Sequence, residues 1–184
     1  MILIVAGVSG SGKTTVGALL AGRLHWRFAD ADDFHPAANV AKMRAGIPLT
    51  DDDRWPWLRA IAAWMDERIA LGESAVLTCS ALKRSYRDVL LGGRPEALLV
   101  FLAVDREVVD RRLAARRGHF FPEKLLGTQF DALEPPQPDE HAVVVPADGD
   151  PEDTVAAIIA IVRPVADTHP GGSGTPGGDH EAET

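Results

Sequence analysis

Residues 2–14 read ILIVAGVSGSGKT, and this stretch decides the fold. Its first five residues form a continuous apolar run, which is typical of a parallel strand covered on both faces. Gly7 to Thr14 then match the pattern GxxxxGK(S/T) at every position, and a helix is expected to begin near Lys13. A strand, a glycine loop and a helix in immediate succession predict a phosphate-binding loop, rather than a turn that merely joins two elements.

The residue types of this loop suit a nucleoside triphosphate. Glycines allow successive backbone N–H groups to point inward at a polyphosphate, and the N-terminus of the following helix adds partial positive charge. We expect Lys13 to reach the β and γ phosphates of ATP and to act in catalysis, and the Thr14 hydroxyl to be a Mg²⁺ ligand. The predicted nucleotide-binding residues of the loop are Gly7, Ser9, Gly10, Ser11, Gly12, Lys13, Thr14 and Thr15.

Further apolar runs alternate with helical patterns along the chain. Runs typical of buried strands lie at residues 76–78, 98–102 and 142–145, with a weaker fifth candidate at 27–31. Helical spacing of apolar residues marks the segments near 58–69 and after Asp150. This order predicts an α/β fold of the P-loop NTPase type. We expect a three-layer α/β/α sandwich with a five-stranded parallel sheet, a short mobile lid, and ligands at the carboxyl ends of the strands.

Length and charge limit what the chain can be. Its 184 residues fit one domain, which we expect at residues 1–167, followed by a disordered Gly/Pro-rich acidic tail at 168–184. The net charge of −8 disfavours binding to nucleic acid, and no apolar run approaches the roughly 20 residues that span a bilayer. Cys79 is the single cysteine, so no internal disulfide can form. These features predict a cytoplasmic enzyme with neither a nucleic-acid nor a membrane partner.

Carboxylates follow the second predicted strand, at the edge of the sheet where the phosphate loop should lie. The sequence there is Asp30-Ala31-Asp32-Asp33. A kinase needs a group that accepts or orients the proton of the attacking hydroxyl, and a carboxylate can also hold Mg²⁺ through water. Asp32 is our first choice for this catalytic role and Asp30 for a structural one, since side chains alternate along a strand. The other interpretation is that these residues cap a helix starting at Pro36, as we expect of Asp33.

Basic residues follow the third predicted strand. Lys83, Arg84 and Arg87 stand near small hydroxyl side chains, a combination that would suit an acidic, hydroxylated substrate. Arg54, next to the helical segment near 58–69, is another candidate for binding an anion, because its planar guanidinium can grip a carboxylate through two bonds. For any single arginine the alternative is an ordinary solvated helix face.

A second basic group follows the fourth predicted strand. Arg112 and Arg116 precede a glycine-containing segment at about 117–122, which we interpret as the lid. These arginines are expected to close over the triphosphate and neutralise the charge that builds on the transferring group, which makes Arg116 a catalytic candidate. His119, taken alone, is better explained as an ordinary surface residue.

Four segments, in this order, resemble the gluconate kinase family, a relative of the shikimate and adenylate-type kinases. They are GVSGSGKTTVG (7–17), DADDFHPAANVAKMRAGIPLTDDDRWPWL (30–58), TCSALKRSYRDVL (78–90) and RRGHFFPEKLLGTQFDALEPP (116–136). The second and third are far more specific than a phosphate loop alone. Ala31 departs from the family pattern, in which glycine is frequent between the two aspartates, and the segment after 167 has no counterpart.

The resemblance implies transfer of the γ-phosphate of ATP to the 6-hydroxyl of D-gluconate, which gives 6-phosphogluconate for the pentose phosphate pathway. It also implies a homodimer, a role for Asp32 on the acceptor hydroxyl, and Arg112 and Arg116 over the nucleotide. The substrate residues that it implies are Asp32, His35, Lys42, Arg54, Lys83, Arg84, Arg87, His119 and Gln129.

Two alternatives remain open from the sequence. Another small-molecule kinase, for shikimate or a nucleoside monophosphate, would use the same fold and phosphate loop. A regulatory module that uses ATP as a switch would bind the nucleotide without turnover. The acceptor separates the three hypotheses, because only the gluconate kinase should release ADP when a sugar acid is added.

Overall fold

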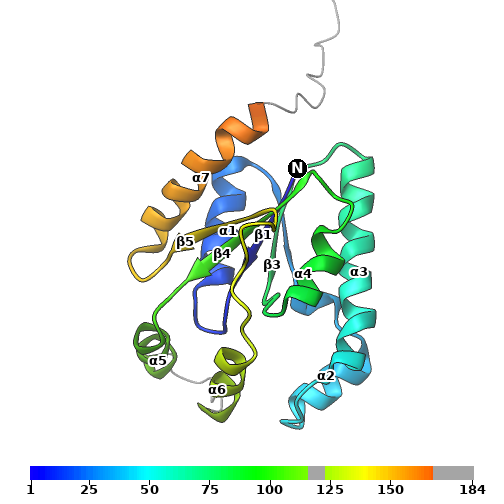
Figure 1. Cartoon of the computed structure of the whole chain (residues 1–184), viewed down its shortest axis with the longest axis vertical. Helices are drawn as coiled ribbons and strands as arrows, with labels where there is room; N and C mark the ends of the chain where they lie inside the picture. The colour runs from blue at the N-terminus through cyan, green and yellow to red at the C-terminus, as the bar shows by residue number, and fades with distance from the viewer. Residues whose placement is uncertain (116–122, 168–184) are drawn as a thin grey trace, which may run out of the picture.

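The computed structural model describes residues 1–115 and 123–167, in which five parallel strands form one sheet in the order β2-β3-β1-β4-β5 (Figure 1). The strands are β1 (Ile2–Ala6), β2 (Arg27–Asp30), β3 (Ala75–Cys79), β4 (Ala97–Ala103) and β5 (Ala142–Pro146). The helices are α1 (Lys13–Leu24), α2 (Ala37–Arg44), α3 (Asp51–Ala70), α4 (Arg84–Leu91), α5 (Arg106–Ala115), α6 (Glu123–Asp131) and α7 (Pro151–Asp167), with a 3-10 turn η1 (Ala31–Phe34) after β2.

Helices cover both faces of this sheet, which confirms the predicted three-layer α/β/α fold. Helices α3 and α4 pack on one face, and α1 and α7 pack on the other (Figure 1). Every predicted strand is present, and the weaker candidate at 27–31 forms β2 at one edge. The predicted lid at 117–122 and the predicted tail at 168–184 lie outside the described residues, so both stay predictions.

Strand β1 is the centre of the core. Its five residues are fully buried, and it pairs with β3 on one side and β4 on the other. Ile2 and Ile4 pack against the layer of α3 and α4, whereas Leu3 and Val5 pack against that of α1 and α7. Because both faces are covered, the strand carries no polar side chain, and the loop that follows it leaves from the middle of the carboxyl edge of the sheet.

Helix α3 begins earlier than its apolar pattern suggests. Thr50 and Asp53 form a capping box, in which the Thr50 hydroxyl accepts the Asp53 N–H at 3.3 Å and the Asp53 carboxylate accepts the Thr50 N–H at 3.0 Å. The helix therefore starts at Asp51, and Pro56 lies inside its second turn, where it removes one backbone hydrogen bond. The aspartates at 51–53 occupy the first turn, as expected from the helix dipole.

The prediction that Asp33 caps a helix starting at Pro36 is wrong. Helix α2 begins at Ala37 after Pro36, and no side chain caps it. The cap at this point belongs to the preceding 3-10 turn, where the Asp30 carboxylate accepts the Asp32 N–H at 3.1 Å. Pro36 stands at the N-cap position itself, and its side chain has no hydrogen-bond acceptor that could serve as a cap.

Cys79 closes β3 as a small buried residue. Its side chain is almost fully covered, and burial raises the pKa of the thiol to about 12. Among the helices of residues 1–115 and 123–167, none combines the length and the apolar character that crossing a membrane requires.

Helix α1 lies so close to the sheet that one of its glycines has no room for a side chain. A Cβ atom on Gly17 would stand 2.6 Å from Cγ2 of Thr78 and 3.1 Å from the ring of Phe28. Gly22, one and a half turns further along the same helix, faces open space. The two positions share a backbone conformation but differ in what surrounds them.

This contrast gives a stability prediction. Gly17→Ala should lower the free energy of unfolding by about 1–3 kcal/mol, because the new methyl group overpacks the contact of α1 with β3. Gly22→Ala should raise it by about 0.5–1 kcal/mol, because alanine loses less backbone entropy in a helix. Urea unfolding of both variants checks this, and equal shifts in the two would contradict the close packing at Gly17.

Candidate active site

The loop between β1 and α1 has the backbone of a phosphate-binding loop. Gly7 and Gly12 adopt φ angles of 146° and 99°, which a residue with a side chain rarely reaches. A side chain on Gly7 would also meet the Ser11 hydroxyl at 2.9 Å. Lys13, at the first position of α1, folds back so that its Nζ donates to the carbonyl of Val8 at 2.8 Å. The ammonium group is therefore held against the loop that it is predicted to serve.

Arg112 lies beside this loop. One of its terminal nitrogens donates to the Ser11 carbonyl at 3.2 Å, and the other to the carbonyls of Asp148 and Gly149 at 3.1 Å. A groove of about 320 Å³, lined in part by Gly12, Thr15 and Arg112, runs along the outside of the loop toward the start of α7. The arginine thus connects α5 with the loops that follow β1 and β5.

A cleft of about 220 Å³ opens over the phosphate loop at the carboxyl edge of the sheet. Lys13 and Thr14 line it from α1, Asp30 and Asp32 from the segment after β2, and Ser80 from the segment after β3. Burial and the neighbouring charge of Asp30 raise the pKa of Asp32, while Lys13 opposes that shift. The structure therefore brings together the lysine, the hydroxyl and the carboxylate that the sequence assigned to phosphoryl transfer.

This cleft fits a magnesium ion held together with phosphate. The Thr78 hydroxyl lines it, is only 1% exposed, and has no hydrogen-bond partner among the described residues. With Thr14 and the two aspartates it offers the hard oxygen atoms that Mg²⁺ prefers. The described residues contain no cluster of three or more His, Cys, Asp or Glu suited to a metal. Protein groups would thus supply only part of the coordination shell, and phosphate and water the rest, as is usual for Mg²⁺ at phosphate sites.

A second cavity of about 220 Å³ lies next to the cleft, and Ser80 lines both. Two cationic side chains line it, Arg54 from α3 and Lys83 from the end of the loop after β3. Among the described residues that line it, Asp51 is the one acid. Such a cavity suits a small polar anion, with its reacting end at Ser80 and the phosphate cleft.

Asp51, the acid in this cavity, is hydrogen-bonded to Lys83, one of the two cations. Lys83 Nζ lies 2.8 Å from both carboxylate oxygens of Asp51, and the Tyr86 hydroxyl donates to the same carboxylate. These hydrogen bonds lower the pKa of Asp51, with that from Lys83 the larger cause. Arg54 lies over the Tyr86 ring, 5.8 Å from its centre. Sequence reasoning missed Asp51 and Tyr86, although Tyr86 stands one helical turn after Lys83.

Gln129 lines the second cavity, whereas His35 lines neither cavity and packs behind a wall of the second one. The Gln129 carbonyl accepts the Ser9 N–H at 2.7 Å and its amide nitrogen donates to the Ser9 hydroxyl at 3.0 Å, so α6 is bonded to the phosphate loop. His35 stacks on Trp57, which lines the second cavity, with ring centres 4.3 Å apart. Burial, and then the charge of Arg54, lower the pKa of His35 to about 4, so its ring is neutral near neutral pH.

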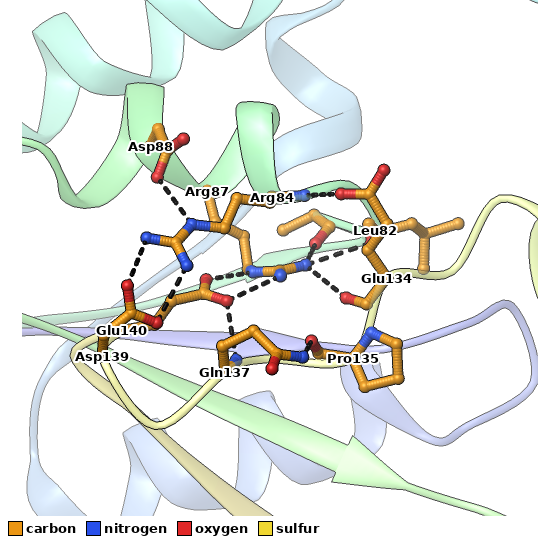
Figure 2. Close-up of polar contacts among 10 residues, drawn as sticks. Leu82, Arg84, Arg87, Asp88, Glu134, Pro135, Gln137, Asp139 and Glu140 are labelled. Atoms are coloured by element: carbon orange, nitrogen blue, oxygen red, sulfur yellow. Dashed lines mark hydrogen bonds and ion pairs between the residues drawn. The ribbon is translucent and has the colours of Figure 1, made fainter.

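The structure does not bring Lys42 or Arg84 into either cavity. Lys42 pairs with the Asp53 carboxylate at 2.6 Å, where it supports the start of α3. Arg84 makes two hydrogen bonds of 2.9 Å to Asp139 (Figure 2). Neither residue is among those that line the phosphate cleft or the second cavity.

The assignment of Arg87 to the substrate is wrong. Its side chain is fully buried, and all three guanidinium nitrogens are engaged within the protein (Figure 2). It forms a two-pronged ion pair with Glu140 and donates to three backbone carbonyls. An acceptor could reach it only by displacing these partners. The remaining predicted site residues, Arg116 and His119, lie outside the described residues.

The loop that lines both cavities contains a strained residue. Ala81 has a φ of 44°, in the left-handed region, and its side chain is buried. For a residue with a Cβ this conformation costs roughly 1–2 kcal/mol, so the surrounding contacts must hold it in place. Ser80 lines both cavities, and the residue that follows it is therefore held in a backbone conformation that alanine does not favour.

Taken with the fold, this site defines a class of protein: a kinase of the P-loop type. A family model described as an AAA domain matches residues 2–136. The shikimate kinase of Aquifex aeolicus shares the fold at a TM-score of 0.57 and 18% identity, covering 92% of this chain and 100% of that one.

The chain belongs to the gluconokinase family. It is 44% identical over 179 residues to a probable gluconokinase of Mus musculus, covering 88% of this chain and 97% of that protein. It is 44% identical over 165 residues to the thermoresistant gluconokinase of Escherichia coli, covering 88% of this chain and 93% of that protein. Among solved structures, a sugar kinase from Janibacter matches with a TM-score of 0.82, 45% identity and coverage of 91% and 98%. A gluconokinase from Sinorhizobium meliloti matches with a TM-score of 0.79 and 42% identity, covering 90% of this chain and 93% of that one.

The position of Lys13 gives a binding prediction. Lys13→Met should weaken the binding of Mg-ATP by about 10–100-fold, because a hydrogen bond to a charged group contributes about 1.5–3 kcal/mol. Isothermal titration calorimetry measures this. Lys42→Met is the control, since that lysine serves α3, and it should leave the affinity for ATP unchanged. An unaltered affinity in Lys13→Met would remove the lysine from the nucleotide site.

Proposed function

We propose that this protein is an ATP-dependent gluconokinase, which transfers the γ-phosphate of ATP to the 6-hydroxyl of D-gluconate and gives 6-phospho-D-gluconate and ADP. Membership of the gluconokinase family supports the reaction. The observation that carries the proposal is the cationic cavity that shares Ser80 with the phosphate cleft. An acidic acceptor bound in this cavity would lie next to the phosphate loop.

The residues of the cleft have separate roles in this proposal. The backbone of the phosphate loop and Lys13 bind and orient the triphosphate of ATP, and Thr14 and Asp30 face the expected Mg²⁺. When bound, Mg²⁺ would neutralise charge on the phosphates. Asp32 orients the attacking hydroxyl and accepts its proton. Its raised pKa suits a base, because proton transfer is most efficient when the pKa of the base approaches the working pH.

The second cavity matches the chemistry of gluconate, a carboxylate that carries a chain of hydroxyl groups. Arg54 and Lys83 supply positive charge for the carboxylate, and Arg54 can bind it through two parallel hydrogen bonds. Asp51, Thr128 and Gln129 offer polar atoms for hydroxyl groups. Because Lys83 is already paired with Asp51, net affinity for an acid in a protein of charge −8 then depends most on Arg54.

A panel of acceptors tests the proposed function. ADP release with Mg-ATP should be fast with D-gluconate and absent with shikimate, AMP or no acceptor. Turnover with another sugar acid alone would keep the kinase and reject gluconate. Binding of ATP without turnover on any acceptor would indicate a nucleotide switch. The homodimer and the role in the pentose phosphate pathway that the resemblance implies stay predictions. The cytoplasmic location that the composition implies also stays a prediction.

The role of Asp32 predicts both a rate and a pH profile. Asp32→Asn should lower kcat by about 10²-fold or more while sparing the affinity for ATP, since it removes the base but not a phosphate contact. In the unmodified enzyme, kcat should fall as the pH drops through the raised pKa of Asp32, because protonation removes the base. Steady-state kinetics from acid to neutral pH check both. If kcat is unchanged in Asp32→Asn, the base lies elsewhere.

The position of Arg54 in the cationic cavity predicts which Michaelis constant changes when this residue is substituted. Arg54→Ala should raise the KM for gluconate by about 10–100-fold, the effect of losing a charge-assisted hydrogen bond, with little change in the KM for ATP. Arg59, an exposed arginine on the same helix, provides the control, and Arg59→Ala should alter neither constant. Equal increases for both substrates in Arg54→Ala would exclude this arginine from the acceptor site.

A further inference from the structure

Arg87 joins three segments that are far apart in the sequence (Figure 2). From α4, its Nη1 faces the carbonyls of Ala81 and Leu82 at 3.2 and 3.1 Å and that of Glu134 at 2.8 Å. Its other two nitrogens bind the Glu140 carboxylate. Both side chains of this ion pair are buried, Arg87 completely and Glu140 to 3% exposure.

Glu134 and Glu140 bound a strap, residues 134–140, that connects α6 to β5. The strap makes further bonds to the loop after β3: the Glu134 N–H donates to the Leu82 carbonyl at 2.9 Å, and the Arg84 N–H donates to the Glu134 carboxylate at 2.6 Å. Arg84 also pairs with Asp139 on the strap. The strap therefore holds the loop through its backbone as well as through side chains.

The held loop is the one that forms the acceptor cavity. Ser80, Ala81, Leu82 and Lys83 all line that cavity, and Ala81 is the residue in the left-handed conformation. Two of the three carbonyls that Arg87 binds, those of Ala81 and Leu82, belong to this loop. Arg87 thus bonds directly to the backbone whose strained shape sets the positions of Ser80 and Lys83.

The same strap continues from α6, which is bonded to the phosphate loop through Gln129 and Ser9. One connected path of hydrogen bonds therefore runs from the phosphate loop through α6 and the strap to Arg87 and the acceptor loop. A buried ion pair is a weak source of stability, because the cost of desolvating both charges offsets their attraction. The fixed geometry of the pair is better suited to holding α4, the loop after β3 and the strap in fixed positions relative to one another.

We propose that Arg87 and Glu140 are positioning residues for phosphoryl transfer: the buried pair fixes the loop at 80–83 so that Ser80 and Lys83 present the acceptor to the phosphate cleft. The pair touches no substrate and acts through that loop. This inference rests on the proposed function for its kinetic test, but the order that it assigns to the loop can be measured without any acceptor.

The chain contains a matched control for this role. Arg94, just beyond α4, forms a two-pronged ion pair with Asp66 and donates to the carbonyls of Val89, Leu90 and Gly92. The hydrogen-bond pattern repeats that of Arg87, but the Asp66 side chain is 56% exposed, whereas that of Glu140 is buried. Arg94 lies before β4, at the opposite end of the sheet from the phosphate loop, and it holds no cavity residue.

The experiment compares Arg87→Lys with Arg94→Lys. Lysine keeps the charge but cannot span a carboxylate and three carbonyls at once. Both variants should lower Tm. Only Arg87→Lys should raise the KM for gluconate, on the order of 10-fold, since a small misplacement of binding groups is enough to impair a reaction. Its Kd for ATP should stay within about twofold of the unmodified enzyme, because the phosphate loop is intact. Glu140→Gln, which keeps the volume of the side chain, should reproduce the effect if Arg87→Lys does not fold.

Two results would overturn the proposal. In the first, both variants have a lower Tm but an unchanged KM for gluconate. This result would make the role of the Arg87 pair purely structural. The second is an equal loss of affinity for ATP and gluconate in Arg87→Lys. If the unmodified protein does not phosphorylate gluconate, hydrogen exchange decides instead. Amides at 80–84 should exchange faster in Arg87→Lys and not in Arg94→Lys, and unchanged exchange would refute the positioning role.

Discussion

The loop that leaves β1 must turn back into α1 between Ala6 and Lys13, at the end of the fully buried central strand of the sheet. The N–H groups of Gly7, Ser9 and Ser11 bond to Ser80, Gln129 and Val8. Glycines at left-handed φ angles let the remaining N–H groups of the loop face a common centre. An anion is the natural partner for these groups. The remaining parts of the site are placed relative to this loop by the parallel sheet, which brings all of its carboxyl ends to one edge.

The register of the sheet explains how the acidic groups reach the loop. Asp30 at the end of β2 lies opposite Thr78 near the end of β3, so that carboxylate and hydroxyl stand side by side. Asp30 then caps the 3-10 turn and fixes the course of the backbone toward Asp32. In this way Asp30, which caps the turn, sets the position of Asp32, the proposed base. The close approach of α1 at Gly17 completes the arrangement, because it brings Thr14 over the same strands.

Sequence reasoning succeeded where the relevant interactions are local. The phosphate loop, the buried strands and the placement of Asp32 follow from neighbouring residues and from the periodicity of the apolar runs. It failed for Arg87, because an arginine on a helix after β3 looks the same whether it faces a ligand or a carboxylate at position 140. Asp51 was missed for a related reason: an aspartate in the first turn of a helix already has a sufficient local explanation, and its bond to Lys83 spans 32 residues. Pairing across long stretches of chain is decided by the fold, which no single segment encodes.

The covered thiol at the end of β3 has a practical consequence. Cys79 is the single cysteine of the chain, and its sulfur is buried with a pKa of about 12, so almost no reactive thiolate exists in the folded protein. An alkylating reagent can modify it only when β3 separates from its neighbours. The rate of alkylation would therefore report the opening of the sheet beside the acceptor loop, with no label added to the protein.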